Sequence, residues 1–143
     1  RRDVLARLAA LVALPSFTSR AAHAVSGDPL GGTAPDYQAG RRRRDWTAAE
    51  ISEQALARCR AEGMRWRAID ALAATAMAEA RASDQRLRRG RLRGPMDGVP
   101  VFAKSIHDVA GLPTTGSSAE WARLFPDAVR RDALEVARLR AAG

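Results

Sequence analysis

The fold of this chain is decided by the stretch Gly94-Pro95-Met96-Asp97-Gly98-Val99-Pro100-Val101-Phe102-Ala103-Lys104. Its first five residues are typical of a turn, because Gly, Pro and Asp supply the backbone conformations that turns need. The next five are apolar without alternation, as in a strand buried on both faces. Pro100 suits such a strand only near its first residue or at an edge. The stretch therefore predicts a turn followed by a buried strand that ends at Lys104.

Lys104 is the only lysine among 24 Lys and Arg residues in the 143-residue chain. One interpretation is that its methylenes cover apolar surface while the ammonium reaches water. The other is that it is partly buried and serves as a base near neutral pH, which arginine cannot do because its guanidinium stays protonated. A chain that otherwise uses arginine for every cation favours the base.

The loop that follows Lys104 is dense in hydroxyls and turn residues, and such loops at strand ends are where α/β proteins place their chemistry. His107 suits a hydrogen-bonding loop residue better than an acid or base, and Asp108 stabilises the loop or Lys104. Adjacent serines after threonines are commonly turn formers rather than nucleophiles. Individual roles stay open for Ser105, His107, Asp108, Ser117 and Ser118.

Upstream of this stretch the pattern predicts helices. Thr47-Ala48-Ala49-Glu50 is a capping box that starts a helix, which Gly63 can end and on which Cys59 is a core residue. A second helix is expected over residues 75–89, with Gly90 at its end. Residues 68–72 suit either a strand or a helix start. The Gly-, Pro- and Arg-rich residues 25–45 predict a linker, so that the folded domain spans 46–143.

The first 24 residues have the parts of an export signal in the usual order. Arg1 and Arg2 precede a short apolar run, Leu8 to Leu14, and a small-residue cleavage site at Ala22-His23-Ala24. The paired arginines favour a twin-arginine signal and a periplasmic or extracellular location. The alternative is an ordinary amphipathic helix. The run is far shorter than the ~20 residues of a membrane-spanning helix, so no stable membrane anchor is expected.

Charge and composition exclude several classes of function. The formal charge is +8, but Arg41 to Arg44 and Arg86 to Arg93 flank expected helices, which indicates solvated helix ends. No patterned basic face or nucleic-acid motif accompanies them, so no nucleic-acid partner is expected. One cysteine and two histidines cannot make an ordinary metal-ligand cluster, so the chain predicts no metal and no cofactor.

The residues from Gly94 to Lys104, continuing through Asp108-Val109-Ala110-Gly111-Leu112-Pro113-Thr114-Thr115, resemble the lysine-bearing segment of the amidase-signature family. Upstream, residues 47–63 and 68–90 are similar to that family's N-terminal helices. Downstream, residues 136–143 are similar to the helix after the lysine loop. The resemblance covers about residues 46 to 143. Ser105 departs from the family pattern, which very often has aspartate there.

The resemblance implies an α/β fold in which helices flank a mixed central sheet, of which this chain is an N-terminal portion. It also implies hydrolysis of small-molecule amides by a Ser, cis-Ser, Lys triad without a cofactor, in which a neutral lysine takes a proton through the bridging serine. Only Lys104 corresponds to a triad member, and the 143 residues contain no Gly/Ser-rich nucleophile loop. The chain alone is therefore expected to be inactive.

Three alternatives accompany this amidase fragment. The chain could be an interaction module that complements a separate serine-bearing half, or the glutamine-hydrolysing component of a tRNA amidotransferase. The third alternative is a basic nucleic-acid or membrane-surface binder that uses Arg41 to Arg44. An export signal argues against the amidotransferase, which is cytoplasmic. The substrate and the oligomeric state are not determined by the sequence.

Overall fold

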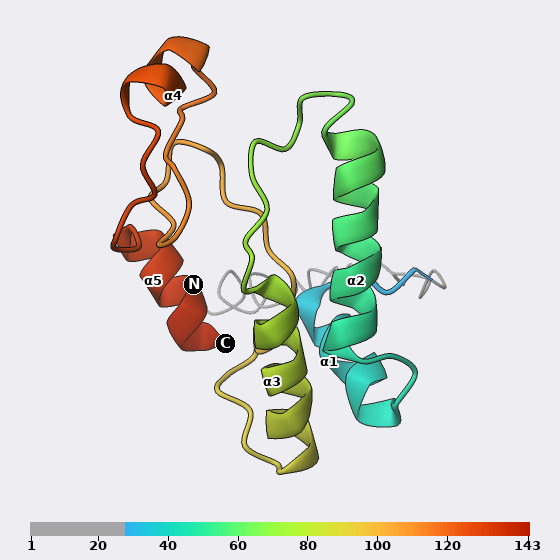
Figure 1. The fold of residues 1–143 in the computed structure, drawn as a ribbon. Coiled ribbons are helices and arrows are strands. Elements are labelled where there is room, and N and C mark those ends of the chain that lie inside the picture. The colour runs from blue at the N-terminus through green and yellow to red at the C-terminus, as the bar shows by residue number, and fades with distance from the viewer. Residues whose placement is uncertain (1–27) are drawn as a thin grey trace, which may run out of the picture.

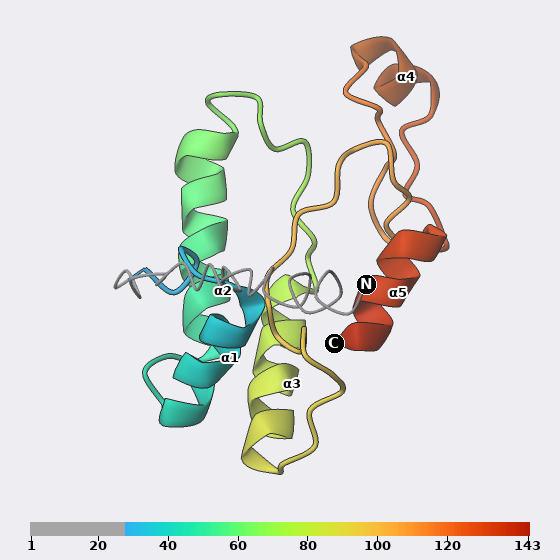
Figure 2. The same cartoon turned by 180° about the vertical axis from the view of Figure 1, so that it is seen from behind.

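The computed structural model describes residues 28–143, so the export signal expected over residues 1–24 lies outside the described residues. Figure 1 shows α1, α2 and α3 packed together, with α4 and α5 on the other side of the molecule. The view from behind in Figure 2 gives the same grouping. The helical elements are α1 (Ala34–Arg43), α2 (Ala48–Arg58), the π-helical turn η2 (Cys59–Gly63), α3 (Ala76–Arg88), α4 (Ala119–Leu124) and α5 (Leu134–Ala142).

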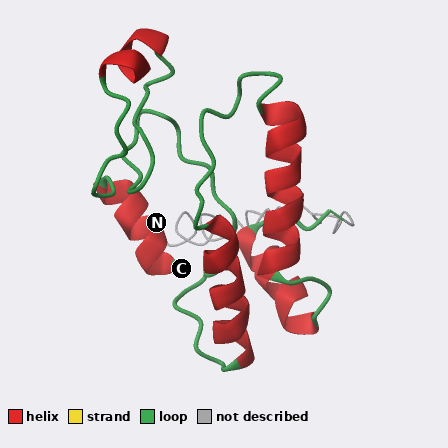
Figure 3. Cartoon of the chain, in the orientation of Figure 1, coloured by secondary structure: helices red, strands yellow, loops and turns green. Residues whose placement is uncertain are grey.

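The expected buried strand is not formed. Residues 99–103 have no regular secondary structure, and Figure 3 shows only helices and loops in the part of the chain that the structure describes. Val101 and Phe102 are exposed. A strand exists only when a neighbouring strand accepts and donates its backbone hydrogen bonds, and no segment within residues 28–143 offers that pairing. The strand prediction is therefore wrong for the described residues, and the mixed sheet is not seen among them.

Helices α2 and α3 form where the sequence predicts them. The Thr47 hydroxyl accepts the N–H of Glu50 at 3.1 Å and the Glu50 carboxylate accepts the N–H of Thr47 at 2.8 Å, so the capping box is confirmed. The helix continues through η2 to Gly63, and Cys59 is buried as expected. Residues 68–72, for which strand and helix were both open, form an irregular loop.

The prediction that residues 25–45 form a linker is wrong for α1. Thr33 and Asp36 make a second capping box at the start of this helix. Gly40 lies so close to Trp46 that a Cβ there would be 2.0 Å from the indole ring, and the Trp46 Nε1–H donates to the Tyr37 carbonyl at 3.2 Å. Helix α1 is thus packed against the start of the domain instead of connecting to it loosely.

Arg41 joins α1 to the rest of the structure. Only 1% of this residue is exposed, so the prediction of a solvated helix end is wrong here although Arg42, Arg43 and Arg44 are exposed. Its Nη2 donates to an Asp84 carboxylate oxygen at 3.0 Å and to the Ser83 hydroxyl at 3.0 Å, both on α3. A buried guanidinium needs such partners because its desolvation is expensive.

Asp84 also binds the N-terminus of α2. Besides Arg41, its carboxylate accepts the N–H groups of Ala48 at 2.8 Å and Ala49 at 3.0 Å. These amides belong to the first turn of α2, where N–H groups lack partners within the helix and the helix dipole favours negative charge. A single carboxylate on α3 therefore neutralises Arg41 of α1 and caps α2.

The turn of residues 94–98 packs against the buried Arg41. Its prediction as a turn is confirmed. The Asp97 carbonyl accepts hydrogen bonds from Arg41 and from the Gln38 amide. Gly98 has φ +79, and a Cβ there would lie 2.3 Å from the Ser83 hydroxyl, so only glycine fits. The Tyr37 hydroxyl donates to the Gly98 carbonyl at 2.9 Å, and burial raises the pKa of Tyr37 to about 12.

The Asp97 carboxylate holds the other side of the turn. It is fully buried and accepts hydrogen bonds from the Arg86 guanidinium at 2.6 and 2.8 Å and from the Arg93 N–H at 2.8 Å. Burial by itself would raise the pKa of Asp97, but these bonds outweigh it and hold the pKa well below the usual range. Asp97 is therefore ionised at neutral pH and fastens the turn to α3.

We expect Arg41→Met to destabilise the chain by about 3–5 kcal/mol, because it leaves the Asp84 carboxylate buried without its cation. Arg42→Met is the matched control, since the neighbouring Arg42 is exposed; it should change the free energy of unfolding by less than about 0.5 kcal/mol. Urea unfolding followed by circular dichroism measures both. Equal midpoints for the two variants would contradict the role given to Arg41.

We expect Asp97→Asn to lower stability by about 2 kcal/mol at neutral pH, because charge-assisted hydrogen bonds are lost. Since the pKa of Asp97 is depressed by folding, its stabilisation is present above its usual pKa of about 3.9 and is lost as the pH falls below that value. The parent chain should therefore lose more stability than Asp97→Asn between about pH 5 and about pH 2.

Acid titration of the unfolding free energy tests this, with Asp127→Asn as the control. Asp127 is an exposed carboxylate in a loop. Its variant should follow the parent curve, and parallel curves for Asp97→Asn and the parent would refute the linkage.

Candidate active site

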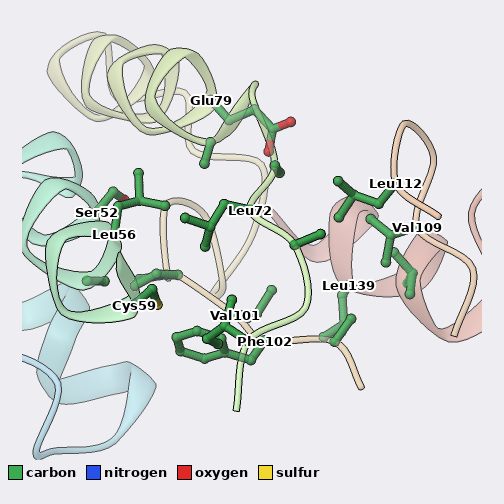
Figure 4. Close-up of a pocket in the computed structure, with 18 of the residues that line it drawn as sticks. Ser52, Leu56, Cys59, Leu72, Glu79, Val101, Phe102, Val109, Leu112 and Leu139 are labelled. Atoms are coloured by element: carbon green, nitrogen blue, oxygen red, sulfur yellow. The ribbon is translucent and has the colours of Figure 1, made fainter. Parts of the chain in front are cut away.

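A groove with a volume of about 960 Å³ is lined by residues of α2, α3 and α5 and by the loops of residues 67–73 and 98–105. Figure 4 shows that most of the side chains facing it are apolar, with Ser52 and Glu79 among the polar exceptions. The labelled apolar lining includes Leu56, Leu72, Val101, Phe102 and Leu139. A concave, largely apolar surface with a few polar groups is what small-molecule sites usually offer.

Lys104 lines this groove but is exposed. The Lys104 carbonyl accepts the His107 N–H at 2.9 Å, which turns the chain immediately after the lysine. Its ammonium makes no hydrogen bond or ion pair to any other residue in the range 28–143. The described residues thus bring the lysine to the groove without burying it, so its role as a base stays a prediction.

The loop after Lys104 closes on itself at Ser105. The Ser105 carbonyl accepts the Gly116 N–H at 2.9 Å, and the Ser105 and Ser117 hydroxyl oxygens are 2.8 Å apart. Next to them, the Thr115 hydroxyl donates to an Asp70 carboxylate oxygen at 2.6 Å. The sequence left the roles of Ser105 and Ser117 open and did not single out Asp70, because these contacts join residues 12 and 45 positions apart.

The polar residues between Ser105 and Ser117 fasten the loop to its surroundings. His107 Nδ1 pairs with a carboxylate oxygen of Glu135 on α5, which agrees with a hydrogen-bonding loop residue. The backbone of Glu135 and then this histidine lower the pKa of Glu135. The Asp108 carboxylate accepts the Thr114 hydroxyl at 2.6 Å, so Asp108 stabilises the loop itself.

Two further contacts fix the far side of this loop. Ser118 is the N-cap of α4, where its hydroxyl accepts the Trp121 N–H at 3.2 Å, as expected of a turn former. Asp132 accepts the Ala110 N–H at 2.8 Å and pairs with Arg140 of α5 at 2.8 Å. Arg140 also pairs with Glu79 of α3 at 3.3 Å, which links the two sides of the groove.

The described residues offer neither a metal site nor a membrane span. Within 28–143, no three His, Cys, Asp or Glu side chains are grouped so that they could share a metal ion. None of the helices described has the length and apolar character that a bilayer crossing requires.

Comparison with known proteins gives a family match. The model of the family described as Amidase matches residues 50–143. The chain is similar to a glutamyl-tRNA(Gln) amidotransferase subunit of Chloroflexus aurantiacus, with 39% identity over 112 residues that cover 78% of this chain and 22% of that protein. It is also similar to a protein named amidase from Pseudomonas putida, with 40% identity over 76 residues, 52% of this chain and 16% of that protein.

Solved structures give the same result. The native peptide amidase from Stenotrophomonas maltophilia is similar with a TM-score of 0.72 and 30% identity, over 82% of this chain and 24% of that one. A peptide amidase in complex with the inhibitor chymostatin gives a TM-score of 0.67 and 33% identity, over 77% and 22%. The chain therefore spans about a fifth of the curated relatives and about a quarter of the solved ones.

We expect the apolar groove to bind a hydrophobic dye in the 143-residue chain, because Phe102 is 70% exposed at its edge. Phe102→Ser should weaken the binding of an anilinonaphthalene sulfonate several-fold in a fluorescence titration. Trp66→Ser is the matched control, since Trp66 is also 70% exposed but lies outside the groove lining. A larger loss in the Trp66 variant would show that the groove is not the binding surface.

Proposed function

This chain belongs to the amidase family, and on that premise we propose that it supplies the lysine-bearing N-terminal part of an enzyme that hydrolyses carboxylic amides, with Lys104 as the base. The observation that carries the proposal is the place of Lys104: the only lysine of the chain lines an apolar groove. The substrate class is a small-molecule amide.

In the proposed reaction a neutral Lys104 accepts a proton, through a bridging serine, from the serine that attacks the amide carbonyl. An acyl-enzyme forms, the amine leaves, and water releases the acid. The two serines are not supplied by the 143 residues, which span about a fifth of the relatives, so we assign only the base to this chain.

The exposure of Lys104 in the described residues is consistent with a base supplied by this chain and serines supplied by another part of the protein. An ammonium in water stays charged, and burial in apolar surroundings favours the neutral amine. Val101 and Phe102 lie beside Lys104 and are exposed too. A serine-bearing part that covers the groove would therefore bury apolar surface and desolvate the lysine in the same step.

A second candidate function is glutamine hydrolysis within a tRNA amidotransferase. It is favoured by the similarity to the Chloroflexus aurantiacus protein. The proposed export through residues 1–24 favours the free amidase instead, because tRNA charging is cytoplasmic. Because residues 1–24 lie outside the described residues, the two functions have to be distinguished by the substrate that the protein hydrolyses.

The test uses the protein at the full length that its gene encodes. We expect ammonia release from a panel of primary amides, peptide amides and glutamine, and we expect Lys104→Arg to reduce kcat by about 100-fold or more. Arginine keeps the positive charge but cannot give up its proton. The substitution therefore separates a base from a merely cationic residue.

Arg138→Met is the control, because Arg138 is an exposed residue of α5 outside the groove lining and should keep parental activity. Unchanged kcat in Lys104→Arg would refute the assignment of the base. Hydrolysis confined to glutamine would favour the amidotransferase over the free amidase.

A further inference from the structure

The two successive peptide groups that follow Lys104 are each held by one hydrogen bond. The Lys104 carbonyl accepts the His107 N–H at 2.9 Å, and the next carbonyl, that of Ser105, accepts the Gly116 N–H at 2.9 Å. These carbonyls lie on either side of the Ser105 Cα, so the backbone directly after the lysine has both of its carbonyls paired. The backbone that carries Lys104 is therefore held on its C-terminal side by the loop that follows it.

The two ends of that loop meet at Ser105 and Ser117, whose hydroxyl oxygens are 2.8 Å apart. We call this serine pair the neck of the loop. Both serines line the groove together with Lys104. The distance is that of a good O–H···O hydrogen bond. Without this pair, the side-chain contact that joins the two ends of the loop beside the lysine is lost, and the Ser105 carbonyl to Gly116 bond remains.

Ser117 has a backbone conformation that is unusual for its residue type. Its φ is +58, in the left-handed region that favours glycine. A serine held there needs compensating contacts, and the structure gives it two: the pairing with Ser105, and its N–H directed at the Thr115 hydroxyl oxygen at 3.3 Å. The pairing of its hydroxyl with Ser105 is a reason for serine instead of glycine at position 117.

The neck is also fastened to the opposite loop of the groove. The Thr115 hydroxyl donates to Asp70 at 2.6 Å, and Asp70 belongs to the loop of residues 67–73 that lines the groove. Lys104, the neck and the facing loop thus form one connected set of contacts. Because Ser105 directly follows Lys104 in the chain, we expect a change at the Ser105–Ser117 pair to act on Lys104 through the backbone.

We propose that the Ser105–Ser117 hydroxyl pair is a positioning device for Lys104 in amide hydrolysis. This inference rests on the function proposed above. Neither serine is the nucleophile or the proton carrier in it: each acts through the backbone, by fixing where the lysine amine meets the groove.

The experiment uses the full-length protein and two readouts. Lys104 is the only lysine in the 143 residues, so the rate at which an N-hydroxysuccinimide ester labels it can be followed by mass spectrometry of its peptide, without substrate. Ser105→Ala and Ser117→Ala should each change that rate and its pH profile. Each should also lower kcat by about 3- to 10-fold, the equivalent of one hydrogen bond, with KM unchanged.

Three further variants make the result specific. The double variant of Ser105→Ala with Ser117→Ala should match either single variant, because both remove the same bond. Ser105→Thr keeps a hydroxyl and should restore parental labelling and kcat. Ser118→Ala is the matched control, since Ser118 is the next residue in the chain but its hydroxyl caps α4 and does not bond to Ser105 or Ser117.

Parental labelling and kcat in both alanine variants would overturn the proposal, and so would an equal change in Ser118→Ala, which would indicate general loosening of the loop. Additive effects in the double variant would also overturn it, since the serines would then act separately. Full activity in Lys104→Arg would instead refute the proposed function. The labelling needs no substrate, so the two failures are distinguishable.

Discussion

The buried guanidinium of Arg41 is the constraint on which the rest of the structure depends. Its charge has to be matched inside the protein, and Asp84 of α3, 43 positions away, supplies the match. The same carboxylate accepts two N–H groups at the start of α2. Because one ion pair holds three helices together, their relative placement follows from electrostatics as much as from the small apolar core around Ile51 and Ala80.

The turn of residues 94–98 extends this polar centre toward the candidate active site. Its Asp97 offers its carbonyl to Arg41 and its carboxylate to Arg86. Gly98 then passes against Ser83 at a distance that leaves no room for a side chain. Six residues later the chain reaches Lys104. The docked turn and the lysine are therefore joined by a short irregular segment, residues 99–103, whose Val101 and Phe102 are exposed.

The groove shows the opposite physical character. Its lining is mainly apolar, and side chains such as Phe102 remain exposed. The polar contacts lie at its margins, where Asp70, Asp132 and Arg140 tie loops and helices together. The proposed base, Lys104, thus lies on a largely apolar surface bordered by polar contacts, as small-molecule sites often do.

The sequence by itself determined the local features. The capping box at Thr47, the two central helices, the turn before Gly98 and the family were all predicted, because each depends on residues within a few positions of one another. Helix α1 was missed although Thr33 and Asp36 carried a capping signal, since the glycines and arginines around it were interpreted as a linker. The single lysine pointed to Lys104 through composition alone.

Only the tertiary structure decided which charges are buried and which contacts surround the lysine. Arg41 cannot be told from Arg42 by its neighbours in the chain, because its partners on α3 are brought to it by folding. Residues 99–103 have the composition of a strand, but backbone pairing requires a neighbour that composition cannot supply. The Ser105–Ser117 pair likewise exists because the loop returns on itself. Short-range chemistry can be predicted from the sequence, whereas long-range partnership is a property of the folded chain.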